Sequence, residues 1–234
     1  MIVTLLWGAL GLAVGSVLNP LADRLPRHDG LSLLPDCGAC GKPLVPGQRV
    51  ATLAVLLRRN HCLACGARLP ARRWLFEVSL GLLYALLARR YGLSVSLGVA
   101  SLHAAALVLG AVTDLEERIV PDVVVLPAAL LTIVLSLALS PSQTLNRLQA
   151  GGIAFLLFLA LRALKMGWGD VKLAGYLGLI AGYPRVLACL LVAVLAGGLA
   201  AAGLLLSGRV RRRSYIPYAP YLALGGLLAV LSGV

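Results

Sequence analysis

Charged residues are scarce in this sequence, and acidic residues are the scarcest of them. Only 13% of the 234 residues are charged, with 9 aspartates and glutamates against 21 lysines and arginines, whereas 60% are hydrophobic. Soluble globular domains carry about a quarter charged residues, so this composition leaves no room for a large soluble domain. It predicts a polytopic integral membrane protein.

The amino terminus lacks the basic residues that open a cleaved signal peptide. Its apolar run continues from Met1 to Asn19, so we expect a retained first transmembrane helix over residues 1–21. Further uncharged stretches follow it along the chain. The predicted fold class is therefore all-α, with about eight transmembrane helices of roughly 20 apolar residues each. The expected spans are 2–19, 74–88, 94–112, 123–140, 148–161, 171–183, 186–207 and 218–234.

A polar loop, punctuated by proline and glycine, separates the first two spans. It covers residues 22–73, and residues 74–234 form the remaining transmembrane core. Four thiolates carried on two turns can close a tetrahedral zinc site, so we predict a structural zinc ion in this loop. The expected ligands, spaced C-x2-C-x21-C-x2-C, are Cys37, Cys40, Cys62 and Cys65.

Other uses of the cysteines fit less well. Structural disulfides are rare where thiols stay reduced, as on the cytoplasmic side, and redox catalysis would need a thioredoxin-like unit around either pair. His61 lies beside Cys62 and could replace one ligand, but four cysteines already satisfy the metal, so we expect a solvated histidine. Cys189 stands alone in an apolar stretch and is expected to be a packed core residue.

Positive charge is distributed unevenly among the loops. One set carries most of it, while the opposite set has only Arg89, Arg90, Arg147 and Arg185. By the positive-inside rule the richer set is cytoplasmic, which places both termini outside. This charge should attract anionic lipid headgroups, whereas nucleic-acid binding is not expected because no aromatic platform accompanies it. The richer set comprises residues 24–73, Arg118, Arg162, Lys165, Lys172 and Arg209–Arg213.

Two of the few acids stand at predicted membrane borders. Asp114 lies in TDLEERIVPD at the end of the third predicted span, and Asp170 lies in GWGD at the start of the sixth. Carboxylates at membrane depth are costly and usually functional. For Glu116, Glu117 and Asp122 a solvated interfacial turn is favoured, and for Asp170 a helix N-cap is the structural alternative.

Two facing aspartates could hydrolyse a peptide bond. Like charges in a small site share one proton, so the ionised member takes a proton from the attacking water while the protonated member hydrogen-bonds the substrate carbonyl. Gly167 and Gly169 would support this chemistry by letting the backbone approach an extended substrate. Lys172, two positions beyond Asp170, is explained by extension toward lipid headgroups.

Together, these segments resemble the bacterial type IV prepilin peptidases, which are GxGD-type membrane aspartic proteases. GSVLNPLADRLP resembles the family's first-helix exit, and the cysteine pairs resemble its cytoplasmic zinc-binding loop. TDLEERIVPD and GWGDVKLAGYLG resemble the segments that carry its catalytic aspartates, and IPYAPYLALG resembles its last-helix entry. The resemblance spans nearly the whole chain and implies Asp114 and Asp170 as the catalytic pair.

The resemblance also implies a substrate, a location and a second cofactor. The substrate is the basic leader of a type IV prepilin or pseudopilin, which the family cuts just after a glycine at the cytoplasmic face of the bacterial inner membrane. Many members then methylate the new amino terminus with S-adenosylmethionine. Asn19, Arg24 and Glu77 match positions in the family's N-terminal segment and second-helix start, so they are the implied methyltransferase residues.

Three other functions stay open on the sequence. A presenilin-like intramembrane protease shares GxGD but is expected to lack the tetracysteine loop. A proton-coupled transporter could use Asp114 and Asp170 as a relay, although no inverted repeat of broken helices is visible. A membrane-anchored zinc adaptor would use the two acids only as helix caps. Cleavage of a prepilin by the purified protein would exclude the transporter and the adaptor.

Overall fold

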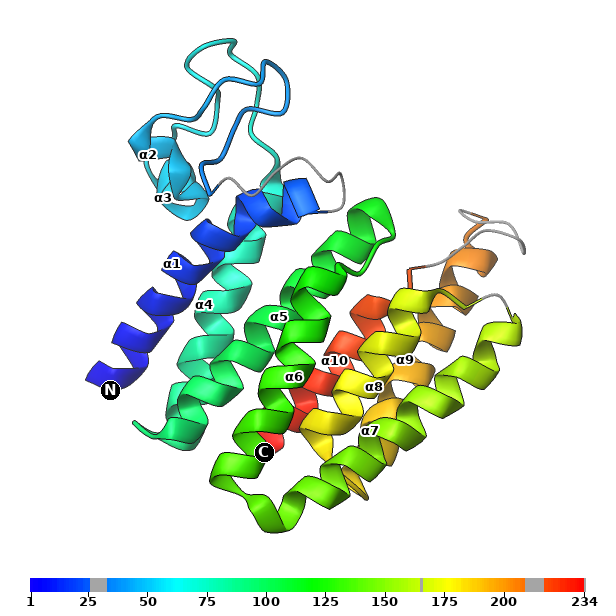
Figure 1. Cartoon of the computed structure of the whole chain (residues 1–234). Coiled ribbons are helices and arrows are strands. Elements are labelled where there is room, and N and C mark those ends of the chain that lie inside the picture. Colours follow the sequence, from blue (N-terminus) through cyan, green and yellow to red (C-terminus); the bar gives the residue numbers. More distant parts are fainter. Residues whose placement is uncertain (26–32, 165, 209–216, 234) are drawn as a thin grey trace. The chain divides into compact units, whose positions relative to one another are not determined.

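The computed structural model describes residues 1–25, 33–164, 166–208 and 217–233 (Figure 1). Most of these residues are helical, and β structure among them is limited to two isolated bridges. The predicted all-α class is therefore confirmed. The helices are α1 (Ile2–Arg24), α2 (Pro46–Arg49), α3 (Ala51–Leu56), α4 (Ala71–Tyr91), α5 (Val95–Glu117), α6 (Asp122–Leu139), α7 (Pro141–Leu161), the 3-10 helix η2 (Arg162–Leu164), α8 (Trp168–Ala181), α9 (Arg185–Leu206) and α10 (Ala219–Ser232).

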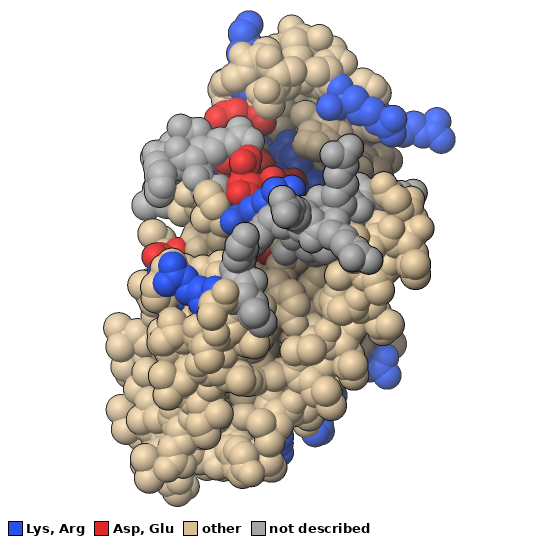
Figure 2. Space-filling model, turned by 90° about the vertical axis from the view of Figure 1, so that its right-hand side faces the viewer, with Lys and Arg blue, Asp and Glu red and all other residues tan. Residues whose placement is uncertain are grey.

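Among the described residues, five helices are long and apolar enough to cross a membrane, namely α1, α5, α6, α7 and α9. Only 22% of the most apolar window of α6, and the same share for α9, is buried inside the protein, as expected for helices that face lipid. Figure 2 shows a broad area of uncharged side chains. The prediction of a multi-pass membrane protein is confirmed.

The remaining predicted spans lie in helices of a different kind. α8 and α10 have 14 residues each, which is about 21 Å at 1.5 Å per residue and shorter than a hydrocarbon core of about 30 Å. α4 is longer but carries Arg72, Arg73 and Glu77 near its start and Arg89 and Arg90 in its last turn. Each predicted stretch falls almost entirely within one helix, while the total of eight spans stays a prediction.

The chain divides into two compact units, Met1–Ala105 and Ala106–Val234. In the first unit α1 packs along α4 (Figure 1). Glycines on α1 allow the two backbones to approach closely, since a Cβ added to Gly11 would lie 2.6 Å from the carbonyl oxygen of Leu80 and Gly15 is similarly close to α4. Small residues pack membrane helices together in this way.

The loop between α1 and α4 contains two short helices that the sequence reading missed. α2 has four residues and begins at Pro46, a residue that suits the first helical position. α3 has six residues and packs against α4. Helices this short show no hydrophobic period. The domain boundaries predicted at residues 21 and 73 stay a prediction, and the basic segment Arg209–Arg213 lies outside the described residues.

In the second unit α8 contacts α6, α7, α9 and α10 (Figure 1). Most of its residues from Asp170 to Gly178 are buried, because a helix with neighbours on several sides must be apolar on several sides. A Cβ added to Gly178 would lie 2.5 Å from the carbonyl oxygen of Ala150 in α7. This close packing determines where the first turn of α8 lies within the unit.

Candidate active site and metal centre

Asp114 lies in the last full turn of α5 and is only 2% exposed. Its Oδ2 accepts a hydrogen bond from the backbone nitrogen of Ala219, at 3.0 Å. Ala219 is the first residue of α10, and the amides that begin a helix lack partners within the helix and carry its positive dipole end. The start of α10 therefore orients this buried carboxylate.

Asp170 lies in the first turn of α8 and is 3% exposed. The N-cap of α8 is Gly167, and no side chain caps the helix. The alternative that Asp170 is the N-cap is therefore wrong. Its carboxylate interacts electrostatically with Tyr218, the residue before Ala219. Asp170 is thus within electrostatic range of the residue before α10.

Both sequence-predicted acids therefore interact with the same short stretch of the second unit, Tyr218–Ala219: Asp114 by a hydrogen bond and Asp170 electrostatically. The sequence did not identify this stretch as a partner of the acids. The local signal for a helix start there is a pair of prolines, Pro217 and Pro220, at the entry to an apolar run. An acid–base pair, in which one member is ionised and the other protonated, needs two buried carboxylates of this kind; the pairing of Asp114 with Asp170 stays a prediction.

Gly169 brings the segment of Asp170 against the segment that follows Asp114. A Cβ added to Gly169 would lie 2.8 Å from Cβ of Val120, which is closer than real Cβ atoms approach, so glycine is required by packing at this position. Gly167 has φ −70° and ψ 152°, an extended conformation open to any residue. A role for either glycine in approaching substrate stays a prediction.

Lys172 forms an ion pair rather than extending freely toward headgroups. Its Nζ lies 2.7 Å from both carboxylate oxygens of Asp122, which joins α8 to the first turn of α6. Both side chains are partly exposed, so the pair contributes little to stability. Glu116 and Glu117 are exposed as expected, but they lie in the last turn of helix α5 rather than in a turn between helices.

The loop cysteines form a metal-binding cluster in the first unit. The ligand sulfurs of Cys37, Cys40, Cys62 and Cys65 all lie within 4.8 Å of one another. Two sulfur pairs are separated by 3.7 and 3.9 Å, and sulfurs held about 2.3 Å from one zinc ion in a tetrahedron are about 3.8 Å apart. The four thiols therefore fit a structural zinc ion and leave no coordination position for water.

Two similar turns position these thiols. In each turn the amide four residues after the first cysteine bonds back to that cysteine, from Gly41 to Cys37 and from Gly66 to Cys62, both at 2.8 Å. Both glycines have positive φ, a conformation that glycine adopts without steric cost. Backbone amides of Ala39 and Cys40 also lower the pKa of Cys37, which favours the thiolate form that binds zinc.

Two further residues, His61 and Cys189, lie outside the metal-binding cluster. His61 is exposed and outside it. Cys189 is buried in α9, as the prediction of a packed core cysteine requires. All five cysteines are free thiols.

Glu77 is the most heavily bonded of the implied methyltransferase residues. It is fully buried, and its Oε1 accepts hydrogen bonds from Asn19 Nδ2 at 3.1 Å and from the amide of Ala51 at 2.8 Å. Its Oε2 accepts from the amide of Thr52 at 2.7 Å and from the Thr52 hydroxyl at 2.8 Å. Glu77 therefore satisfies the first amides of α3 and attaches that helix to α4.

Arg24 is not part of this network. It forms an ion pair with Asp36, the residue before the first cysteine, and so links the end of α1 to the metal-binding turn. The structure thus brings Asn19 and Glu77 together and places Arg24 elsewhere in the first unit. The role of α3 in this arrangement had no sequence signal, because its partner Glu77 lies 26 residues from Ala51.

Comparison with known proteins gives matches over both units. The model of the type IV leader peptidase family matches residues 101–202, and that of the bacterial peptidase A24 N-terminal domain matches residues 9–91. The prepilin leader peptidase/N-methyltransferase of Bacillus subtilis is 30% identical over 230 residues, covering 95% of this chain and 92% of the relative. That of Pseudomonas putida is 31% identical over 258 residues, covering 96% and 88%. No solved structure matches the chain.

Proposed function

This chain belongs to the type IV leader peptidase family, and on that premise we propose that Asp114 and Asp170 cleave the basic leader of type IV prepilins or pseudopilins. The observation that carries the proposal is that both carboxylates are buried and that both interact with the stretch Tyr218–Ala219. The names of the relatives, prepilin leader peptidase/N-methyltransferase, agree with this substrate.

The proposed mechanism is aspartic and needs no metal at the reacting bond. The ionised member of the pair removes a proton from water as the water attacks the scissile carbonyl, and the protonated member donates a hydrogen bond to the carbonyl oxygen. The bond from Ala219 holds the Asp114 carboxylate in one orientation. Burial excludes bulk water and strengthens each of these electrostatic interactions.

We place the active site at the cytoplasmic face of a bacterial inner membrane. The support is the uneven distribution of arginine and lysine among the loops, which favours a cytoplasmic location for the loops that adjoin Asp114 and Asp170. Anionic headgroups would meet the basic loops on the same side. The leader is itself basic, so these loops orient the enzyme rather than attract the substrate.

We propose that the protein also methylates the new amino terminus, as the names of its relatives indicate for them. S-adenosylmethionine would supply the methyl group when bound. The zinc ion would fold the loop rather than take part in either reaction, since four cysteines fill its coordination. Glu77 would act by positioning α3, because its carboxylate is fully buried and bonded to the chain.

The test is cleavage of a prepilin by the purified protein in detergent. We expect Asp114→Asn and Asp170→Asn each to reduce cleavage by about a thousandfold or more, because an amide neither accepts the proton of water nor shares one across the pair. Glu116→Gln is the control, since Glu116 is exposed, and it should retain most activity. Substantial cleavage by either aspartate variant would rule out this mechanism.

A further inference from the structure

The short helix α3 presents leucines to the outside of the first unit. Leu53, Leu56 and Leu57 are 43%, 74% and 51% exposed. Leu56 and Leu57 follow Leu53 by three and four positions, so the three side chains lie on one side of the helix and together form the leucine face of α3. Large apolar side chains gathered on an exposed surface mark a contact with an apolar partner.

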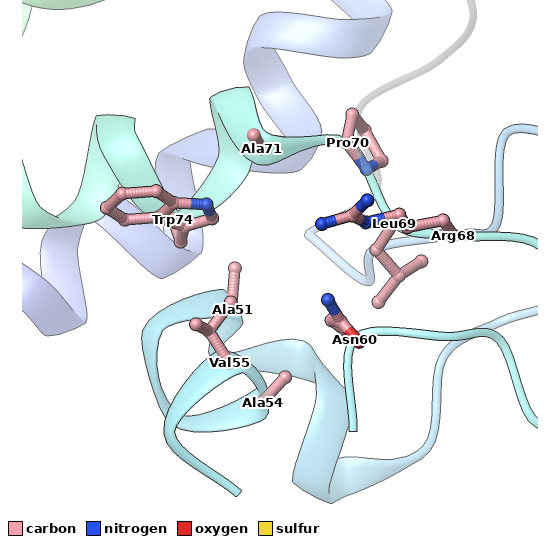
Figure 3. A pocket seen from close by; sticks show the side chains of 9 residues that line it. All are labelled: Ala51, Ala54, Val55, Asn60, Arg68, Leu69, Pro70, Ala71 and Trp74. Atoms are coloured by element: carbon pink, nitrogen blue, oxygen red, sulfur yellow. The ribbon is translucent and has the colours of Figure 1, made fainter. Parts of the chain in front are cut away.

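The other side of α3 is made of alanines and faces the protein. Ala51 and Ala54 are buried. Figure 3 shows them on one side of a narrow cleft, with Ala71 and Trp74 of α4 on the other. The small residues of α3 therefore allow it to lie against the start of α4, while its leucines point elsewhere.

Two contacts place α3 at the level of the membrane border. The amides of Ala51 and Thr52 donate hydrogen bonds to Glu77, which attaches the start of α3 to the second turn of α4 (Figure 1). Glu77 also packs against α1, since a Cβ added to Gly15 would lie 2.8 Å from its Cα. α1 is long and apolar enough to cross a membrane, and its first charged residue is Asp23. α3 therefore lies beside the end of a spanning helix, where headgroups meet hydrocarbon.

The charge around α3 suits an anionic bilayer. From Cys37 to Phe76 the sequence contains seven lysines and arginines and no aspartate or glutamate. Arg58 and Arg59 directly follow the leucine face and are exposed. Leucines bordered by basic residues are typical of helices that lie in a membrane surface, and tryptophan, here Trp74, is enriched at the same depth.

We propose that α3 lies in the surface of the bilayer, with its leucine face inserted among the acyl chains of anionic phospholipids. Arg58 and Arg59 then lie among the lipid phosphates, where each positive charge adds to the attraction. Insertion removes the leucine side chains from water, which favours this position over a solvated one. The metal-binding loop is in this way attached to the membrane at α3 as well as through α1 and α4.

The experiment identifies what covers the leucine face. A photoreactive benzophenone amino acid replaces Leu56 in the full-length protein, which is irradiated in nanodiscs of equal parts phosphatidylethanolamine and phosphatidylglycerol and analysed by mass spectrometry. We expect phospholipid adducts at residue 56, with phosphatidylglycerol favoured severalfold. The same substitution at Leu57 repeats the measurement, and zinc content shows that the loop of each variant is folded.

Leu63 is the matched control position. It is 72% exposed, but it lies in the turn that begins at Cys62. Backbone bonds from Leu69 to Asn60 and from Cys62 to Ala67 extend this turn as a hairpin from the start of α4. A benzophenone there should form few lipid adducts.

The two arginines are tested in the benzophenone protein. Arg58→Gln with Arg59→Gln should abolish the preference for phosphatidylglycerol but keep the adducts to phosphatidylethanolamine, because the leucine face is unchanged. A preference that survives would show that the arginines do not bind the lipid phosphates. Adducts to a second copy of the chain, or to another part of the same chain, would make the leucine face a protein contact. Either of these, or the absence of lipid adducts at both Leu56 and Leu57, would overturn the inference.

Discussion

At the scale of single residues, Gly169 controls how closely the segment of Asp170 can lie against Val120. A methyl group there would require a backbone shift, because the nearest atom would be Cβ of Val120 at 2.8 Å rather than the end of a flexible side chain. We expect Gly169→Ala to lower the rate of prepilin cleavage by about tenfold or more, since small displacements of catalytic groups are costly.

The control for this change is Gly152→Ala. An added Cβ at Gly152, in α7, meets nothing within 4 Å, and alanine favours the helix over glycine. This variant should cleave at the wild-type rate. If Gly169→Ala also cleaves at the wild-type rate, the close approach to Val120 is not needed for catalysis.

A second residue-scale prediction concerns the ion pair of Lys172 with Asp122. Because both side chains are partly exposed, Lys172→Gln and Asp122→Asn should each lower the free energy of unfolding by about 1 kcal/mol or less. Each substitution removes the same ion pair. The free energy of unfolding of the double variant should therefore be no lower than that of the less stable single variant. Thermal unfolding in detergent measures this. If the stability losses of the two single variants instead add up in the double variant, the two residues act separately.

Individual residues also show how far sequence reasoning reaches. Asp114 and Asp170 could be selected because acids are rare and both occur at membrane borders. The bond between Ala219 and Asp114 could not be predicted, because the two residues are 105 positions apart and only tertiary packing brings them together. The pairing of Lys172 with Asp122, 50 positions apart, was missed for the same reason.

At the scale of elements, α3 depends on Glu77. An amide at that position would keep one acceptor oxygen but turn its NH2 group toward the backbone donor of either Ala51 or Thr52, which needs an acceptor. We therefore expect Glu77→Gln to speed hydrogen exchange of the α3 amides by about tenfold or more. Exchange in α9 should be unchanged. Unaltered protection of α3 would show that these hydrogen bonds do not hold the helix.

The metal-binding loop is the second element whose stability can be tested. Its buried apolar cluster is small, comprising Cys37, Leu44 and Cys62, so metal binding must supply much of the free energy that orders it. We expect Cys37→Ser with Cys62→Ser to lose the zinc and lower the yield of folded protein. The single-turnover rate at saturating prepilin should fall much less than in Asp170→Asn.

His61→Gln is the matched control for the metal, since His61 adjoins Cys62 but is exposed and outside the cluster. It should keep its zinc. Elemental analysis of the purified proteins, beside the single-turnover rate, decides the matter. A cysteine variant whose chemical step falls as far as that of Asp170→Asn would show that the metal is not merely structural.

Elements were predictable where composition alone determines them. An uncharged stretch long enough to cross a membrane must be helical, because lipid offers its backbone no other partners, and each predicted stretch proved to be helical. Helix ends were less predictable, since α7 begins at Pro141 rather than near residue 148. Its polar first turns lie outside the apolar run, but proline at the first helical position starts the helix there.

At the scale of the whole molecule, the number of membrane crossings determines which loops face the cytoplasm. In the part of the chain that the structure describes, five helices are long and apolar enough to cross, so the total depends on α4, α8 and α10. α4 has charges at both ends, whereas α8 and α10 are short. A short helix can still cross where neighbouring helices cover it or the bilayer thins, and α8 is largely buried against its neighbours. The charge distribution favours eight crossings, because all the loops rich in arginine and lysine then face the same side of the membrane, as the positive-inside rule requires.

The last prediction tests this count with a reporter that is active only in the periplasm. With eight crossings, fusions after Gly92, Ser140, Tyr183 and Val234 should be active, and fusions after Arg59, Ile119, Gly167 and within Arg209–Arg213 should be inactive. A reporter active only in the cytoplasm provides the reciprocal control at each position. If α8 does not cross, Gly167 and Tyr183 will report the same side, and if α4 does not cross, Arg59 and Gly92 will. Activity at Ile119 and Gly167 would place the loops beside Asp114 and Asp170 in the periplasm, where a cytoplasmic leader could not reach them.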